Sequence, residues 1–269
     1  MRTIVHLSDL HFGRTDPAII EPLVATIAAI APDVVVVSGD LTQRARAAEF
    51  KAARAFLARL PEPKVVVPGN HDVPLYRVWE RFLSPLGKYQ RYVQSDLEPA
   101  YVDAEIAVIG VNTARSLTFK SGRINDEQML SIHARLDPLA ESVIKIVVTH
   151  HPFDLPDEPG NDALVGRAQE AMTVFARCGV DVLLAGHFHT SQSGETSARY
   201  EIAGYAALVV QAGTATSTRG RGEQNSFNVL RVESDRVVVE RQVWQPDVGA
   251  FALARSERFT RDGSRWVEC

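Results

Sequence analysis

Short apolar runs alternate with helical patterns along the first two thirds of the chain. Runs rich in valine and isoleucine predict buried strands, and longer segments with apolar residues every three to four positions predict helices. Strands are expected at Ile4–Ser8, Val34–Val37, Val65–Val67, Ile106–Val111, Ile144–Thr149 and Val182–Ala185. Helices are expected at Pro17–Ala31, Ala45–Leu60, Gln128–Leu139 and Ala168–Cys178. Because crossovers of this length join parallel strands, the order predicts an α/β fold.

The pattern changes in three places. In residues 73–104, Tyr76–Leu86 could form a helix, whereas Gly87 to Pro99 shows no clear period, so we expect an insertion near the functional site that acts as a lid. Residues 152–162 are rich in prolines and acids and predict a loop. After His189, strands without intervening helices are expected at Tyr200–Ile202, Ala207–Gln211, Ser226–Val232 and Val237–Trp244. We expect residues 1–269 to form one domain, with 200–245 as its β-rich part.

Composition narrows the class of protein. An apolar content of 45% and a charged content of 23% over 269 residues are ordinary for a globular chain. The net charge of −4 gives no reason to expect broad binding to nucleic acids or to anionic membranes. No apolar run is long enough to span a membrane, and the first apolar run is too short for a signal peptide. Two cysteines form no disulfide framework, so a reducing compartment, the cytoplasm, is expected.

Polar side chains that bind metals or move protons follow five of the predicted strands. Six of the eight histidines fall in these few positions. Gly69 is expected to let the backbone turn tightly enough to aim its neighbours at one point. The five groups are Asp9-Leu-His11, Gly39-Asp40, Gly69-Asn70-His71-Asp72, His150-His151 and Gly186-His187-Phe-His189.

The mixture of carboxylates, one amide and imidazoles predicts a metal site. Oxygen and nitrogen donors together suit Mn, Fe, Zn or Co rather than Ca or Mg alone. Seven or more donors exceed one tetrahedral site and favour two divalent transition metal ions, with one carboxylate bridging them. Two ions about 3.5–4 Å apart can activate a hydroxide for in-line attack on a phosphoryl group. Each motif alone is compatible with ordinary turn chemistry, but five in one order at strand ends favour the metal site.

Taken together, these motifs resemble the full set of blocks of the calcineurin-like metallophosphoesterases. The resemblance implies a four-layer α/β/β/α sandwich of two mixed β-sheets flanked by helices. It implies that Asp40 bridges the ions, and that His71 lies outside the metal shell, near the leaving group, as a catalytic residue. It further implies that one ion is held by Asp9, His11 and His189, and the other by Asn70, His150 and His187.

Within the family, the chain resembles the bacterial class III cyclic-nucleotide and glycerophosphodiester phosphodiesterases, through its size and the tail Ala212-Gly213-Thr214, Arg219-Gly-Arg221 and Asn225-Ser-Phe-Asn228. This implies a metal-dependent phosphoric diester hydrolase acting on a small phosphodiester, with a 3′,5′-cAMP type of cyclic nucleotide as first choice. Gln43 stands where the family's protein phosphatases carry an acid, which argues against a phosphoprotein substrate. Hydrolysis of glycerophosphodiesters or nucleotide-lipid pyrophosphates, a DNA nuclease and a non-catalytic scaffold remain as alternatives.

Several further residues are candidates for substrate binding. Arg14 and Arg219 could contact a phosphate, although arginines in loops are usually solvated. His151 either donates a hydrogen bond behind a metal ligand or lines the pocket. The expected partner is a small phosphodiester substrate, nucleic acid is not expected, and a homo-oligomer is left open.

Overall fold

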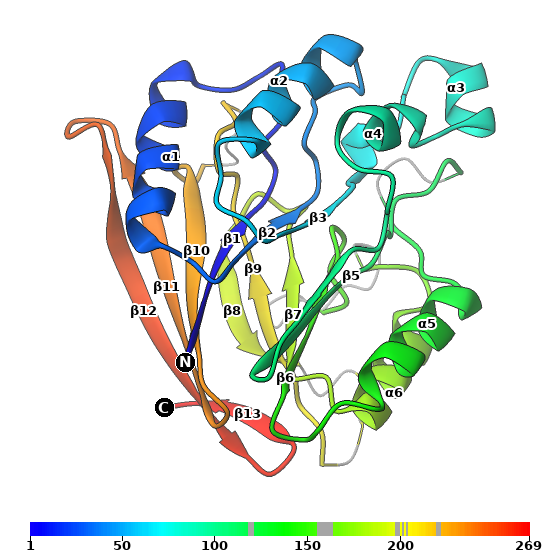
Figure 1. Ribbon diagram of the computed structural model, residues 1–269, viewed down its shortest axis with the longest axis vertical. Coiled ribbons are helices and arrows are strands. Elements are labelled where there is room, and N and C mark those ends of the chain that lie inside the picture. The colour runs from blue at the N-terminus through cyan, green and yellow to red at the C-terminus, as the bar shows by residue number, and fades with distance from the viewer. Residues whose placement is uncertain (118–120, 155–163, 197–199, 201, 203, 219–221) are drawn as a thin grey trace.

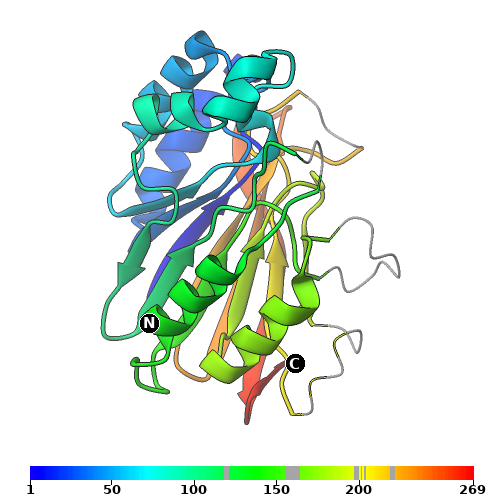
Figure 2. The same ribbon diagram turned by 90° about the vertical axis from the view of Figure 1, so that its right-hand side faces the viewer.

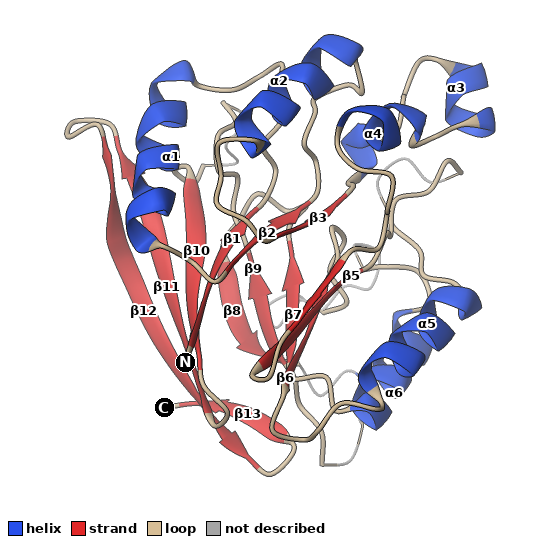
Figure 3. Cartoon of the chain, viewed as in Figure 1, coloured by secondary structure: helices blue, strands red, loops and turns tan. Residues whose placement is uncertain are grey.

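Two β-sheets pack face to face, and helices cover both outer faces, in the computed structural model of the chain (Figures 1 and 2). The described residues are 1–117, 121–154, 164–196, 200, 202, 204–218 and 222–269. The four-layer α/β/β/α sandwich of two mixed sheets is confirmed, and Figure 3 shows helices outside and strands inside.

The first sheet has the order β13-β12-β11-β10-β1-β2-β3. β1, β2 and β3 are parallel, and the other neighbours pair antiparallel. Its strands are β1 (Arg2–Leu7), β2 (Val34–Ser38), β3 (Lys64–Val67), β10 (Ser226–Val232), β11 (Arg236–Gln245), β12 (Ala250–Asp262) and β13 (Arg265–Glu268).

The second sheet has the order β4-β5-β6-β7-β9-β8. The four central strands are parallel, and an antiparallel strand lies at each edge. Its strands are β4 (Ala100–Val102), β5 (Ile106–Gly110), β6 (Ile144–Val148), β7 (Val182–Ala185), β8 (Gln192–Glu195) and β9 (Leu208–Gln211).

The helices lie on the two outer faces (Figure 1). α1 (Pro17–Ile30), α2 (Ala47–Leu57) and α4 (Gly87–Tyr92) pack on the first sheet, and α5 (Asp126–Leu136) and α6 (Ala168–Cys178) pack on the second. A short 3₁₀ helix, η1 (Asn70–Asp72), follows β3, and α3 (Val78–Leu83) follows η1. Asn125 caps the N-terminus of α5, because its side-chain oxygen accepts a hydrogen bond from Gln128 N at 2.9 Å.

The wholly apolar strands have two buried faces. In β2, Val34 and Val36 lie in the core between the sheets, whereas Val35 and Val37 lie in the core beneath α1 and α2. Since side chains alternate across a strand, a continuous valine run is what this position requires. The predicted strand positions up to Ala185 are confirmed within one or two residues.

Three expectations about secondary structure are wrong. Gly87 to Pro99 begins with α4, whose Tyr89 is buried and donates to Val66 O at 2.8 Å. Tyr200 and Ile202 are not in a strand; Tyr200 is buried because its ring packs in the core beneath α6. The strand near this segment is β8, which ends at Glu195, before Tyr200. The sequence analysis also did not predict β12 and β13.

Four further features concern how the chain is organised: the predicted loop, the C-terminal strands, the number of domains and membrane-spanning helices. Most of the loop predicted at 152–162 lies outside the described residues. Because β10 pairs with β1, the C-terminal strands share a sheet with the N-terminal strand. One domain over 1–269, with 73–104 as a lid, stays a prediction. None of the helices among the described residues combines the length and apolar character needed to cross a membrane.

Candidate metal centre

The carboxyl ends of five parallel strands meet at one edge of the sandwich. Asp9 and His11 follow β1, Asp40 follows β2, and Asn70 begins η1 after β3. On the second sheet, His150 follows β6, and the His187-Phe-His189 loop follows β7. Loops from both sheets therefore bring the predicted ligands into two groups that adjoin each other.

The first group contains Asp9, His11 and His189. Asp9 Oδ1 lies 3.5 Å from His11 Nε2 and 3.4 Å from His189 Nε2, and the two nitrogens are 3.2 Å apart. Asp9 Oδ2 accepts from Ser8 Oγ at 2.7 Å and from His187 N at 3.0 Å. The buried Oδ1 thus faces both ring nitrogens, and the three atoms fit a metal ion between them.

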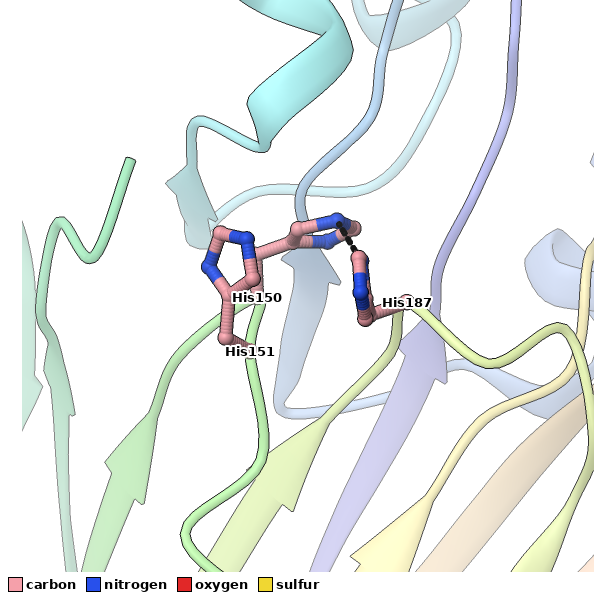
Figure 4. Close-up of side chains that lie close together, drawn as sticks. All are labelled: His150, His151 and His187. Carbon is pink, nitrogen blue, oxygen red and sulfur yellow. Dashed lines mark hydrogen bonds between the residues drawn. The ribbon is translucent and has the colours of Figure 1, made fainter. Parts of the chain in front are cut away.

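The second group contains Asn70, His150 and His187. Asn70 Oδ1 lies 3.1 Å from both His150 Nε2 and His187 Nδ1, and these nitrogens are 3.3 Å apart. Figure 4 shows the rings of His150 and His187 directed at one another. His150 Nδ1 lies 2.8 Å from the carbonyl of Ser38, so Nδ1 donates a hydrogen bond to that carbonyl and Nε2 is the ring atom that faces the group.

Asp40 lies between the two groups. Its Oδ2 is 3.7 Å from His11 Nε2 in the first group, and its Oδ1 is 3.4 Å from His150 Nε2 in the second. The two oxygens of Asp40 therefore face different groups, which is the position expected of a bridging ligand. The whole donor set fits two divalent transition metal ions.

A sequence model of the calcineurin-like phosphoesterase family matches residues 2–191, which is more than half of the chain. The chain belongs to this family. The resemblance drawn from its motifs is therefore confirmed.

Relatives and solved structures extend this finding. A probable glycerophosphodiester phosphodiesterase from Arcobacter nitrofigilis is 25% identical over 162 residues, covering 59% of this chain and 57% of that protein. A probable cyclic nucleotide phosphodiesterase from Synechococcus sp. is 26% identical over 198 residues, which cover 70% of this chain and 73% of that protein. The chain therefore spans little more than half the length of the first of these. A dimetal phosphatase from Danio rerio shares the fold, with a TM-score of 0.68, 14% identity, and coverage of 97% of this chain and 99% of that one.

Both carboxylates of this calcineurin-like site stay ionised despite complete burial. Burial alone would raise the pKa of Asp40, but the charge of His150 outweighs it and holds that pKa well below its usual range. Burial likewise opposes ionisation of Asp9, whose pKa the hydrogen bond from His11 lowers. Although burial acts against it, Asp40 raises the pKa of His150 to about 9. Burial and the His150 charge lower the pKa of His187 to about 4, so one of the two facing rings stays neutral.

The backbone of the ligand residues is strained. Asp9, His11, Asp40, His187 and His189 all have positive φ, between 48° and 78°. This left-handed conformation costs a residue with a side chain roughly 1–2 kcal/mol. Backbone hydrogen bonds hold it in place, including Asp9 N to Gly39 O at 3.1 Å and His11 N to Asp40 O at 2.9 Å. Strain gathered at one edge of a fold is typical of a functional site.

Gly69 has a different role from the one predicted. Its φ is −108°, which any residue can adopt, so it does not turn the chain. A Cβ at this position would lie 2.2 Å from Asp40 Oδ1 and 2.3 Å from Asp40 N. Gly69 is needed because the Asn70 loop passes directly over the central carboxylate.

Three residues that support the ligands were not predicted in that role. The buried Asp72 carboxylate accepts from Leu41 N, Thr42 N and Gly69 N at 3.1, 2.9 and 3.0 Å, which joins the Asp40 loop to the Asn70 loop. Burial and the Asp40 charge raise the pKa of Asp72 to about 6. Thr214 Oγ1 donates to Asp9 O at 2.7 Å, and Thr216 Oγ1 donates to Leu10 O at 2.6 Å. Asp72 and Thr214 belong to motifs that the sequence analysis singled out, but neither motif indicated these contacts, and Thr216 gave no signal.

The remaining candidates lie around the two groups. His71 Nδ1 lies 2.8 Å from Gln43 O, and its backbone N donates to Asp40 Oδ1 at 2.8 Å. His151 packs against His150 and His187, with ring centres 4.8 and 4.7 Å away, and its Nδ1 lies 2.8 Å from Thr113 Oγ1. Arg14 is exposed in the loop after His11. Arg219 lies outside the described residues.

Proposed function

We propose that the chain is a dinuclear metal-dependent phosphodiesterase that hydrolyses a small phosphodiester, with a 3′,5′-cyclic nucleotide as first choice. The observation that carries this proposal is the position of Asp40, whose two oxygens face two separate groups of ligand atoms. One ion would be held by Asp9, His11 and His189, the other by Asn70, His150 and His187, with Asp40 common to both. Bound divalent ions would supply Lewis acidity at the phosphoryl oxygens and lower the pKa of the attacking water.

His71 is the proposed general acid. The carbonyl of Gln43 can only accept a hydrogen bond, so His71 Nδ1 carries a hydrogen and Nε2 is the atom that can lend a proton. As the bond from phosphorus to the leaving oxygen breaks, Nε2 gives its proton to that oxygen, and the ring becomes neutral. Arg14 and His151 are proposed to contact the substrate, and Arg219 keeps the same role as a prediction.

The choice of a diester rests on position 43 and on the relatives. Position 43 carries Gln, where the family's protein phosphatases carry an acid. A site without that acid suits a singly charged diester. Because one relative is a probable glycerophosphodiester phosphodiesterase, glycerophosphodiesters are the second candidate.

A substrate screen tests this function. Protein stripped with a chelator is reconstituted with Mn, Fe, Zn or Co and assayed on cyclic nucleotides, glycerophosphodiesters and phosphomonoesters. We expect no turnover without metal, and a higher kcat/KM on a diester than on every monoester. Full turnover by verified metal-free protein would reject the metal mechanism, and a preference for monoesters would reject the diester assignment.

The proposal also includes the cellular location, the domain organisation and the oligomeric state of the enzyme. Both cysteines, Cys178 and Cys269, are free thiols, which supports a cytoplasmic location that cell fractionation can test. One domain, with 73–104 as a lid beside the site, is proposed as well. Light scattering decides whether the chain forms a homo-oligomer.

A further inference from the structure

The segment around α3 presents an unusual apolar surface. Six of the twelve exposed large hydrophobic residues in the described part of the chain fall within nine positions, and Trp79 and Leu83 are each 80% exposed. Figure 1 shows α3 at a corner of the molecule, outside α4. We call the six residues the α3 surface: Leu75, Tyr76, Val78, Trp79, Phe82 and Leu83. An exposed apolar patch of this kind marks a contact site.

A cationic pocket adjoins the α3 surface. It has a volume of about 460 Å³, and Leu75 and Tyr76 belong both to its wall and to the α3 surface. Its charged lining is Arg44, Arg46, Arg77 and Lys88.

Two acids face these four cations. Glu80 pairs with both Arg77 and Lys88, and Glu49 Oε1 lies 3.9 Å from Arg46 Nε. The Arg44 guanidinium lies over the Tyr76 ring, 5.7 Å from its centre. The pocket therefore keeps an excess of positive charge, although the whole chain has a net charge of −4.

We propose that the α3 surface docks the chain on an anionic lipid membrane. The apolar side chains would enter the boundary between headgroups and hydrocarbon, and the cationic pocket would hold a headgroup phosphate. Charge complementarity selects this occupant over a second copy of the chain. A two-fold contact through this surface would bring the same cations of two copies together, at an electrostatic cost.

Vesicle binding tests the proposal directly, and Trp79 is a built-in probe. The other two tryptophans, Trp244 and Trp266, are 7% and 1% exposed, so a change of environment at the α3 surface should dominate the emission shift. The metal-loaded protein is titrated with vesicles of phosphatidylcholine alone, or with about one third phosphatidylglycerol. We expect binding and a blue shift only with anionic vesicles, weakening as salt rises from about 0.05 to 0.5 M.

Three variants locate the contact. Phe82→Ser combined with Leu83→Ser should lower the partition coefficient at least about tenfold. Arg44→Gln combined with Arg46→Gln should lower it about 25-fold on anionic vesicles, or about fivefold for each charge. Leu130→Ser, at a leucine of α5 whose exposed fraction of 71% lies between those of Phe82 and Leu83, is the control and should change nothing. Circular dichroism and the unfolding temperature verify that each variant folds.

Three outcomes would overturn the proposal of membrane docking. The first is a failure to bind anionic vesicles at low salt. The second is binding that the serine and glutamine variants leave intact. The third is a dimer, detected by light scattering without vesicles, that the serine variant abolishes, since the α3 surface would then join two copies. None of these results bears on the phosphodiesterase assays, which use soluble substrates.

Discussion

Replacing His71 with alanine should separate proton donation from metal binding. The ring lies against the metal centre, because a ligand atom of His71 falls within 4.8 Å of those of His11 and Asp40. A role as a metal ligand therefore competes with the role of general acid. The bond to Gln43 O leaves Nε2 as the atom with a proton to give, and this favours the general acid.

The size of the effect follows from the leaving group. A positioned general acid contributes roughly 10²–10⁴-fold in rate, or about 3–5 kcal/mol of barrier, when the departing oxygen is strongly basic. The ribose oxygen released from a cyclic nucleotide is such a group, whereas a nitrophenolate leaves without needing a proton. His71→Ala should therefore lose about two to four decades of kcat on the cyclic nucleotide and about one decade or less on a nitrophenyl diester.

The assay compares both substrates with the metal content of each variant. His71→Ala should keep two ions per chain by elemental analysis, and its loss should depend on the substrate. Asn70→Ala is the matched control from the neighbouring position, because it removes Oδ1 from the second group and should slow both substrates together. If His71→Ala loses metal, or slows both substrates equally, His71 is a ligand or a positioning residue and the general-acid assignment is wrong.

Three further outcomes follow from the structure. Asp40→Ala should lose both ions, whereas Asp9→Ala should lose one, as elemental analysis can check; equal losses would remove the bridging role. Asp72→Asn should lower the free energy of unfolding by about 1–3 kcal/mol in urea titrations, because an amide replaces a carboxylate that accepts from three backbone N–H groups; an unchanged midpoint contradicts this. Burial lowers the pKa of His6 to about 3, so below pH 6.5 the unfolded chain binds a proton that the folded chain excludes. Metal-free protein should thus lose about 2 kcal/mol through His6 between pH 7.5 and pH 5, and His6→Gln should remove that part of the slope.

The order of the strands and the position of the site were predictable because both depend on local signals. A strand buried on two faces must be apolar at every position, as Val34–Ser38 nearly is. The carboxyl ends of parallel strands meet at one edge, so polar residues after each strand had to converge. The strands at and next to the sheet edges gave no such signal. The edge strand β8 reads Gln-Ser-Gly-Glu, and much of β12, which lies next to the edge strand β13, is exposed, so backbone pairing holds these strands more than burial does.

The supporting contacts were not predictable because they join distant residues. Thr214 reaches Asp9 across 205 positions, and Asp72 reaches Thr42 across 30. No periodicity within a segment records such a contact. The requirement for Gly69 also depends on a distant residue. A side chain at this position would collide with Asp40, which follows another strand, whereas the backbone angles of Gly69 itself do not require glycine.

The left-handed backbone at five ligands shows what these distant contacts do for the site. Aspartate and histidine do not hold this conformation alone, since it costs roughly 1–2 kcal/mol at each position. The hydroxyls of Thr214 and Thr216 bind the backbone of the Asp9 loop, and the carboxylate of Asp72 binds that of the Asp40 loop, so these side chains help to hold the strained backbone. Packing and hydrogen bonds thus accompany an arrangement in which the candidate ligand atoms lie 3.1–3.7 Å apart. The arrangement of the candidate metal ligands should therefore depend on these supporting side chains as well as on the ligands themselves.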